Sequence, residues 1–182
     1  MSYIDGTGTV VWEIDTAIVD PILKVDGNYI LIAEKGRNKI CLYIDNKLQY
    51  DVDDPDTVMS AELSSNGDVV VVTDKSSYRG GISVYNKSGE QIFSWASGSD
   101  AVICADISAA SRSVAVALLN SDVTAKTTVQ LFNVNETESY AKIEMPDTVV
   151  YELQFVGDKV NAFGDNRAVS YTHLTLPTTP YV

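Results

Sequence analysis

Short apolar stretches that alternate with polar residues, broken by turn residues, predict β-strands rather than helices along this chain. The clearest unit extends from Ala61 to Trp95 and contains turns at Asn66-Gly67 and at Lys87-Ser88-Gly89. Asn-Gly between two apolar runs is typical of a tight hairpin, because both central residues of a type I′ turn need positive φ. The run Val69–Val72 is apolar on both faces, so we expect a small antiparallel sheet that is covered on both sides. Its four strands are predicted at residues 58–63, 68–73, 81–85 and 90–95.

The same arrangement recurs on both sides of this unit. Strands are predicted at 22–25, 29–33, 39–44 and 48–52 before it, and at 102–107, 113–119, 127–133 and 140–145 after it. A lone strand at 10–14 begins the series without an earlier partner, and strands at 149–156 and 160–163 begin a fourth copy. The first turns give the spacing: Gly27 and Gly67 are 40 residues apart, and Arg112 and Gly157 follow at intervals of 45. The third strands repeat an aromatic residue, at Tyr43, Tyr85 and Phe132.

A four-stranded unit that returns every 40–45 residues is typical of β-propeller blades. The alternative is a β-sandwich of unrelated hairpins, but a sandwich gives no reason for the repeated aromatic residue. The predicted fold is therefore all-β, an incomplete β-propeller with about three four-stranded antiparallel blades and partial blades at both ends. We place the propeller domain at residues 1–168, with blades at about 20–53, 57–97 and 101–146 and a partial blade at 148–168.

Composition limits the partners of this domain. A chain of 182 residues with 45% hydrophobic and 21% charged residues is long enough to bury a core. A net charge of −12 disfavours binding to nucleic acid and to anionic lipid. No apolar run reaches the ~20 residues of a membrane span, and the first residues do not resemble a signal peptide. We expect no nucleic-acid partner and no membrane insertion within this sequence. Cys41 and Cys104 lie in strand patterns and are predicted to be small buried hydrophobic side chains.

The last fourteen residues, Val169–Val182, differ from everything before them. They contain no charged residue, two prolines and several threonines. Residues 169–178 match the translation of a sequencing adapter, and we interpret 169–182 as a non-native tail and the chain as a fragment of a longer gene. The tail contains His173, the single histidine. Within the preceding residues this excludes Ser-His-Asp, Cys-His and histidine-based zinc sites.

Several stretches carry a resemblance to known proteins. VVWEI, NYILIAEK, KICLYIDN and GGISVYNKSGEQIFSW, with FGDN in the last repeat, resemble bacterial WD40-like and quinoprotein-like propellers. More specifically they resemble a family of uncharacterised bacterial propeller proteins that usually carry an N-terminal membrane anchor. The resemblance covers about residues 9–167, although the Trp-Asp and Gly-His signatures of strict WD40 repeats are missing. It implies no activity, and it implies an extracytoplasmic, anchored location for the complete protein, while this sequence shows no anchor.

An acidic segment is one candidate for chemistry. Asp51, Asp53, Asp54 and Asp56 offer four carboxylates within six positions, which could supply oxygen ligands to calcium. The segment lacks the glycine and the distal glutamate of an EF-hand loop, and Asp and Pro favour turns. We interpret it as a solvated connection between blades, and we expect neither a metal nor another cofactor.

A second candidate comes from the repeat itself. Lys24, Glu62, Asp106 and Glu152 are polar residues on the predicted first strands and could face the central channel. There the three acidic residues could hold a cation, but the same register could also direct all four to the rims of the blades.

Two classes of function follow. The first is a non-catalytic binding or scaffolding propeller with an unknown protein or small-molecule ligand, such as the extracytoplasmic part of an anchored protein. The alternative is a propeller enzyme, or a quinone- or cation-binding module, that uses the channel. If the chain is an open arc, its terminal blades should leave apolar side chains under-packed; the expected residues are Val10, Trp12, Leu153, Phe155 and Phe163.

Overall fold

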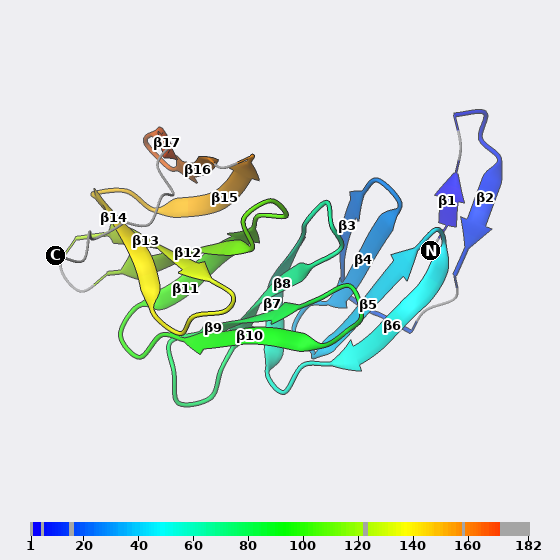
Figure 1. The fold of residues 1–182 in the computed structure, drawn as a ribbon, viewed down its shortest axis with the longest axis horizontal. Coiled ribbons are helices and arrows are strands. Elements are labelled where there is room, and N and C mark those ends of the chain that lie inside the picture. Colours follow the sequence, from blue (N-terminus) through cyan, green and yellow to red (C-terminus); the bar gives the residue numbers. More distant parts are fainter. Residues whose placement is uncertain (1, 5, 15–16, 122–123, 158, 172–182) are drawn as a thin grey trace, which may run out of the picture.

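A computed structural model describes residues 2–4, 6–14, 17–121, 124–157 and 159–171, and these form seventeen strands and no helix. The strands make five antiparallel sheets that follow one another along an open arc (Figure 1). Three sheets have four strands each, as the repeat predicts, and we call them the first, second and third blades. The all-β propeller architecture predicted from the period is confirmed.

Each blade is a meander in which consecutive strands are neighbours. The first blade contains β3 (Pro21–Asp26), β4 (Tyr29–Glu34), β5 (Lys39–Ile44) and β6 (Lys47–Asp53). The second contains β7 (Thr57–Leu63), β8 (Val69–Asp74), β9 (Gly81–Tyr85) and β10 (Gln91–Ala96). The third contains β11 (Ala101–Ile107), β12 (Ser113–Asn120), β13 (Lys126–Asn133) and β14 (Ser139–Pro146).

Smaller sheets stand at the two ends of the arc. The C-terminal sheet has three strands, β15 (Val150–Val156), β16 (Lys159–Gly164) and β17 (Ala168–Tyr171). The N-terminal hairpin pairs β1 (Ser2–Ile4) with β2 (Val10–Glu13). The expectation that the strand at 10–14 has no earlier partner is therefore wrong. The sequence interpreted as a tail begins inside β17, and residues 172–182, with His173, lie outside the described residues.

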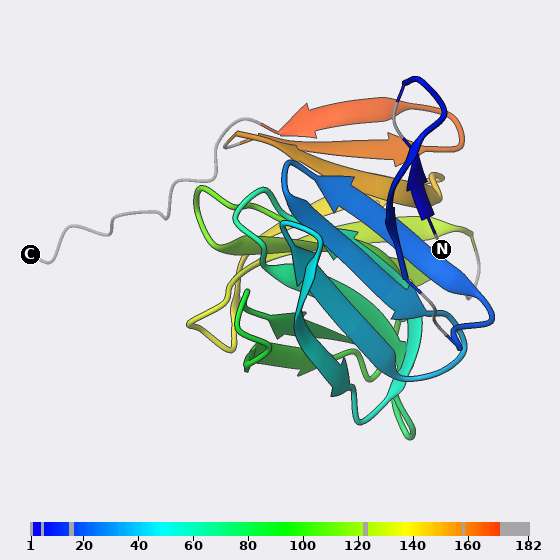
Figure 2. The ribbon, with the colours of Figure 1, turned by 90° about the vertical axis from the view of Figure 1, so that its right-hand side faces the viewer.

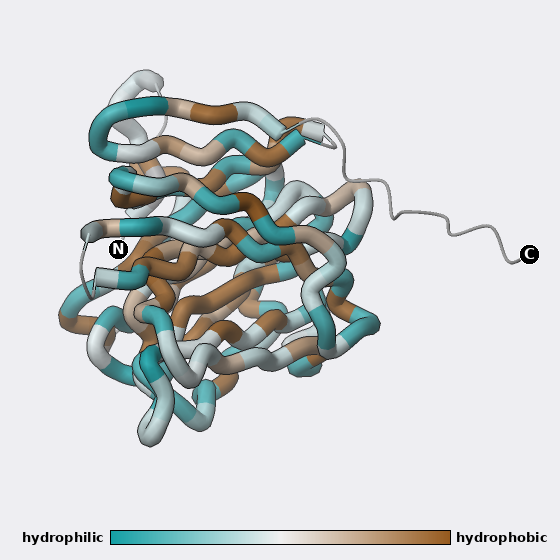
Figure 3. Tube along the Cα trace, turned by 90° about the vertical axis from the view of Figure 1, so that its left-hand side faces the viewer, coloured by the Kyte–Doolittle hydropathy of each residue, from teal (hydrophilic) through white to brown (hydrophobic). Residues whose placement is uncertain are grey.

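The run of four valines in β8 is explained by packing on both sides. Val69 and Val71 belong to the core between the first and second blades, whereas Val70 and Val72 belong to the core between the second and third. A third core joins the third blade to the C-terminal sheet. Figure 2 shows the sheets side by side, and Figure 3 shows hydrophobic stretches gathered along the interior strands, with the hydrophilic ones mainly in the loops. The second and third blades are thus covered on both faces by their neighbours, as the alternating side chains of their strands require.

The turns between first and second strands repeat in conformation. Gly27, Gly67, Arg112 and Gly157 all have positive φ, between 52° and 86°. The positive φ predicted for Gly27 and Gly67 is confirmed. The type I′ turn predicted at Asn66-Gly67 is wrong, because only Gly67 has positive φ. The side-chain oxygen of Asn66 accepts a hydrogen bond from the N–H of Asp68 at 3.0 Å and so stabilises the turn. A type I′ geometry occurs instead at Asp45-Asn46, where both residues have positive φ between β5 and β6.

The terminal residues are better packed than the open arc predicts. Leu153 is buried, so it is predicted wrongly, whereas Phe155, which packs against the third core, and Phe163 are only partly buried. Trp12 contacts the ring of Tyr43 edge-on, with 5.3 Å between ring centroids. Val10 is exposed, as expected.

Candidate functional site

The first strands of successive sheets lie next to one another on the inner side of the arc. β3 contacts β7, β7 contacts β11, and β11 contacts β15. The fourth strands β6, β10 and β14 lie on the outer rim (Figure 1). Any residue near the end of a first strand is therefore close to its counterparts in the neighbouring sheets.

A cavity of about 640 Å³ opens where these first strands turn into the second strands. Lys24, Glu62, Asp106 and Glu152 all line it, so the structure brings together the four residues predicted to face the channel. They come from β3, β7, β11 and β15, one from each of the three blades and one from the C-terminal sheet. Their shared position follows from the repeat, because equivalent residues of adjacent sheets occupy equivalent places around the arc.

The first two of these residues form an ion pair. The Nζ atom of Lys24 lies 2.6 Å from Oε1 of Glu62 and joins the first blade to the second. Both side chains are more than one third exposed, so water screens the pair and its contribution to stability is small. The pair also means that Lys24, the one cationic side chain among the described residues that line the cavity, is already neutralised.

Asp106 joins the third blade to the C-terminal sheet. Its Oδ2 atom accepts the backbone N–H of Phe155 at 2.6 Å. The pKa of this carboxyl is raised from 3.8 to about 6: burial raises it most and the nearby Glu62 adds to the rise, while the hydrogen bonds from Phe155 and Ile107 and the charge of Lys24 oppose it. Asp106 is thus a carboxyl that can change its protonation near neutral pH.

Further residues line the cavity that the sequence patterns did not single out. They are Asp26, Ser64, Ser65, Tyr151 and Gln154, among others. Asp26 and the two serines lie next to the repeated turns, and that position could have identified them. Tyr151 lies at an irregularity in the pairing of β15 with β16, between Val150 and Glu152, which the alternating pattern does not reveal. Among the described residues, the cavity therefore carries four carboxylates, one lysine and several hydroxyl and amide groups.

The acidic segment at the end of β6 and in the connection after it does not gather around one point. Asp51 lies 2.5 Å from the Nζ of Lys39, with Asp53 3.8 Å from the same atom, and Asp56 lies 3.3 Å from Lys75. Asp54 is buried and accepts hydrogen bonds from the hydroxyl of Tyr85 at 2.7 Å and from the N–H of Asp56 at 2.8 Å. The expectation of a solvated connection is wrong for Asp54, which ties the end of the first blade to β9.

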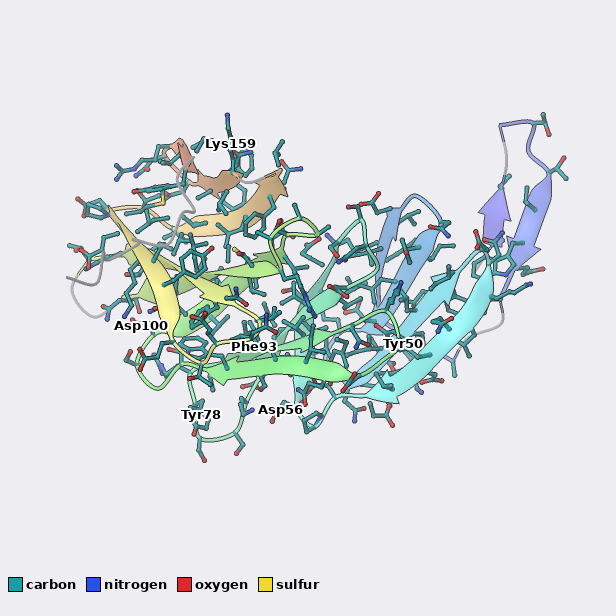
Figure 4. The ribbon with its side chains drawn as sticks, viewed as in Figure 1. Tyr50, Asp56, Tyr78, Phe93, Asp100 and Lys159 are labelled. Atoms are coloured by element: carbon teal, nitrogen blue, oxygen red, sulfur yellow. The ribbon has the colours of Figure 1, made fainter. Side chains whose placement is uncertain are left out.

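Metal-binding geometry is not found in the described part of the chain. No group of three or more His, Cys, Asp or Glu side chains there is arranged to hold an ion. This applies to the acidic segment, where Asp56 lies at the loop edge of the molecule (Figure 4), and to the carboxylates of the cavity. Cation binding by the carboxylates of the cavity stays the alternative hypothesis that the sequence left open, and for the acidic segment the sequence predicts no metal.

The two cysteines are free thiols. Cys41 is buried beside Ile32 and Tyr43, and Cys104 packs at the edge of the third core. Burial raises the pKa of both thiols, that of Cys41 to about 11, so neither is an activated nucleophile at neutral pH. Cys41 is buried as predicted, whereas Cys104 is only partly buried.

The chain is similar in sequence to one protein family and in structure to several solved proteins. The sequence profile of a family of unknown function (DUF5711) matches residues 1–179, and this match does not mark a boundary at residue 168. No curated protein has significant sequence similarity. None of the described residues forms a helix that is long and apolar enough to cross a membrane.

Solved structures show the fold. The computationally designed Ika4 protein aligns with a TM-score of 0.61 and 14% identity over 87% of this chain and 93% of its own. BBS1N, solved in complex with ARL6DN, aligns with a TM-score of 0.65 and 14% identity over 96% of this chain and 59% of its own. BamB from Moraxella catarrhalis aligns with a TM-score of 0.58 and 13% identity over 91% of this chain and 50% of its own. The structural neighbours include WD40 and BamB β-propellers, and this chain spans 59% of the length of BBS1N and 50% of that of BamB.

Proposed function

The chain belongs to a family of unknown function (DUF5711), and we propose that it is a non-catalytic binding propeller whose inner cavity holds a positively charged group of a protein or small-molecule partner. The observation that carries this proposal is the meeting of Glu62, Asp106 and Glu152 with Asp26 around one cavity. Among the described residues, four carboxylates and a single lysine line it, which leaves an excess of negative charge in the cavity. An ammonium or guanidinium group is the chemistry that such a charge attracts.

A protein partner is supported by the fold. Propellers offer a wide rigid rim whose loops carry binding residues. A propeller of similar fold, BBS1N, is seen in complex with another protein, ARL6DN. A lysine or arginine side chain at the tip of a partner's loop is small enough for a cavity of this size.

The alternative function, an enzyme or a quinone- or cation-binding module in the channel, has no specific observation in its favour. The cavity contains carboxylates and hydroxyl groups, but nothing in it singles out a quinone or a reacting group. Fold similarity does not decide the question, since one fold serves many functions.

The cellular location belongs to the proposal as well. The resemblance to anchored bacterial propellers supports an extracytoplasmic position for the complete protein. Fractionation of cells that express the complete gene, followed by protease treatment from the outer side, tests this. Protection of the propeller in intact cells would contradict an extracytoplasmic position.

Titration calorimetry with spermidine, a small polyamine, tests the binding proposal, with calcium titrated separately. We expect saturable spermidine binding that weakens several-fold in Glu152→Gln, which removes an exposed carboxylate from the cavity. Glu136→Gln is the matched control, because it removes the same charge from an exposed loop residue away from the cavity. Equal loss of affinity in both variants would show that only the net charge attracts the polyamine, and saturable binding of calcium alone would favour the alternative.

A further inference from the structure

The carboxyl of Asp106 belongs both to the cavity and to a joint between two sheets. It lines the cavity from β11, and its Oδ2 atom accepts the backbone N–H of Phe155 on β15 at 2.6 Å. Since β11 and β15 contact each other, this hydrogen bond fixes the carboxyl in the wall of the cavity. A change in the charge of Asp106 therefore occurs next to any group that the cavity holds.

Two further carboxylates act on the same part of the wall. The thiol of Cys104, two residues before Asp106, has its pKa raised most by burial and then by the charges of Glu62, Glu152 and Asp106. All three carboxylates are thus within electrostatic range of one atom, although they lie on three strands. Glu62 is paired with the ammonium group of Lys24, whereas Asp106 and Glu152 form no ion pair with any described residue.

The titratable groups around Asp106 come from each strand near it. They are Lys24 and Asp26 on β3, Glu62 on β7, Tyr151 and Glu152 on β15, and Cys104 on β11 itself. Two other strands contact β11: β12 has no titratable residue, and β8 has only Asp74, at the end that pairs with Thr57 and outside the cavity lining. Among these groups Glu62 raises the pKa of Asp106 and Lys24 lowers it, after burial as the largest cause, and the result is about 6.

A cation in the cavity favours the ionised form of Asp106 over the neutral form. Deprotonation places another negative charge in a partly buried wall beside Glu62, which is why burial and Glu62 oppose it. An ammonium or guanidinium group offsets that charge. A ligand that stabilises the ionised carboxylate promotes loss of its proton, and by reciprocity the ionised carboxylate binds the ligand more tightly.

We propose that binding of a cationic group in the cavity is coupled to release of the proton of Asp106, so that pH controls the occupancy of the cavity. This inference rests on the proposed function, the binding of an ammonium or guanidinium group. Lys24 shows the chemistry, because its ammonium group is held by Glu62 at 2.6 Å. The group of the partner takes the carboxylates with which Lys24 does not pair, Asp106 and Glu152. The transition spans about one pH unit on each side of 6.

Titration calorimetry with spermidine between about pH 5 and about pH 7.5 tests the coupling. Every protein carries His173→Asn, because histidine, present once in the chain, ordinarily titrates in this range. Each titration is repeated in two buffers of different ionisation enthalpy, which gives the number of protons passed to the buffer. We expect the affinity to rise several-fold across this range, with release of a fraction of one proton that is largest at or below pH 6.

Asp106→Asn and Glu152→Gln are a matched pair of variants, since each removes one carboxylate from the same cavity. Asp106→Asn should bind spermidine as weakly as the parent chain does at about pH 5, and the difference between the two should grow to several-fold at about pH 7.5. Glu152→Gln should bind more weakly than the parent chain but keep its pH dependence and its proton release.

The results separate this inference from the proposed function. Saturable binding whose affinity is the same across the pH range, without proton release, overturns the coupling and leaves the cation site standing. A pH dependence that persists in Asp106→Asn assigns the proton to another group and also overturns it. If spermidine does not bind saturably at about pH 7.5, the proposed function is wrong and the coupling is wrong with it. Circular dichroism checks that the variants are folded, and the proton release of the parent chain and of Glu152→Gln decides the matter if Asp106→Asn is not.

Discussion

Two glycines that occupy the same turn in successive blades differ in their surroundings. Gly27 and Gly67 both have positive φ, yet a Cβ at Gly67 would lie 2.6 Å from Cε1 of Tyr29, whereas a Cβ at Gly27 would meet nothing within 4 Å. Alanine at either position should cost ~1 kcal/mol for the left-handed backbone. We expect Gly67→Ala to lose more, because the Tyr29 ring must also move. Urea unfolding of the two variants measures the difference, and equal midpoints would contradict it.

Two buried tyrosines offer a second matched comparison. The hydroxyl of Tyr85 donates to the buried carboxylate of Asp54 at 2.7 Å, while the hydroxyl of Tyr50 has no hydrogen-bonding partner among the described residues. Tyr85→Phe leaves a buried carboxylate short of a donor and should cost about 1–3 kcal/mol. Tyr50→Phe removes an unsatisfied group and should be neutral or stabilising. Thermal unfolding of both variants provides the measurement, and a larger loss in Tyr50→Phe would refute this account of Asp54.

These residues also show what the sequence could reveal. The positive φ of Gly67 follows from its place after Asn66 and before an apolar run. Its contact with Tyr29 joins residues of different blades, and no local pattern contains it. The role of Asp54 was missed for the same reason: the acidic segment looks uniformly solvated, and only the tertiary position of Tyr85 separates Asp54 from its neighbours.

At the scale of the strands, apolar periodicity and turn residues were nearly sufficient. The fifteen predicted strands all occur, with ends that differ by a residue or so from the observed ones. β1 and β17 were not predicted, since β1 is three residues long and β17 lies in a stretch whose composition differs from the rest. Both are recognisable only through their pairing with β2 and β16.

The joint between β11 and β15 should respond to pH. The pKa of Asp106 is raised from 3.8 to about 6 in the folded protein, chiefly by burial. A raised pKa means that folding favours the protonated carboxyl. The contribution of Asp106 to the free energy of unfolding is therefore fully present below pH 3.8 and is lost as the pH rises through about 6. A pKa that is higher by about two corresponds to at most ~3 kcal/mol in the free energy of unfolding.

The variant Asp106→Asn isolates this effect. Its side-chain oxygen can still accept the N–H of Phe155, but it carries no charge to bury. We expect Asp106→Asn to be more stable than the wild type near neutral pH, and the advantage to disappear as the pH falls towards 4. Chemical unfolding of both proteins across this range provides the comparison. A difference in stability between the two proteins that does not change with pH would show that the pKa of Asp106 is the same in the folded and the unfolded protein.

At the scale of the whole molecule, the repeat places the candidate site. Because the blades are equivalent, matching positions on first strands had to meet on one side of the arc, and Lys24, Glu62, Asp106 and Glu152 do line one cavity. The sequence left open whether they face the channel or the rim, since this depends on strand tilt and on the loops around them. The ion pair of Lys24 with Glu62 and the hydrogen bond from Phe155 to Asp106 depend on contacts between blades that spacing cannot specify.

An arc in which each sheet contacts only its neighbours should unfold in parts when one joint is weakened. Phe132 is buried between the second and third blades, with its ring 5.0 Å from Trp95 and 5.7 Å from Phe93. Phe132→Ala should cost ~3–5 kcal/mol at that joint. With Trp12 changed to Phe, Trp95 is the only remaining tryptophan and reports on the joint by fluorescence. We expect the fluorescence change of Phe132→Ala to occur at lower urea than the loss of β-structure by circular dichroism.

The control is Leu42→Ala, a truncation in the core between the first and second blades. When only that joint is weakened, the fluorescence change of Trp95 should still occur at the urea concentration at which the second and third blades unfold, because the core between these two blades is intact. If the two signals coincide in Phe132→Ala, the sheets unfold as one cooperative unit, and coupling then extends across the whole arc rather than stopping at each interface.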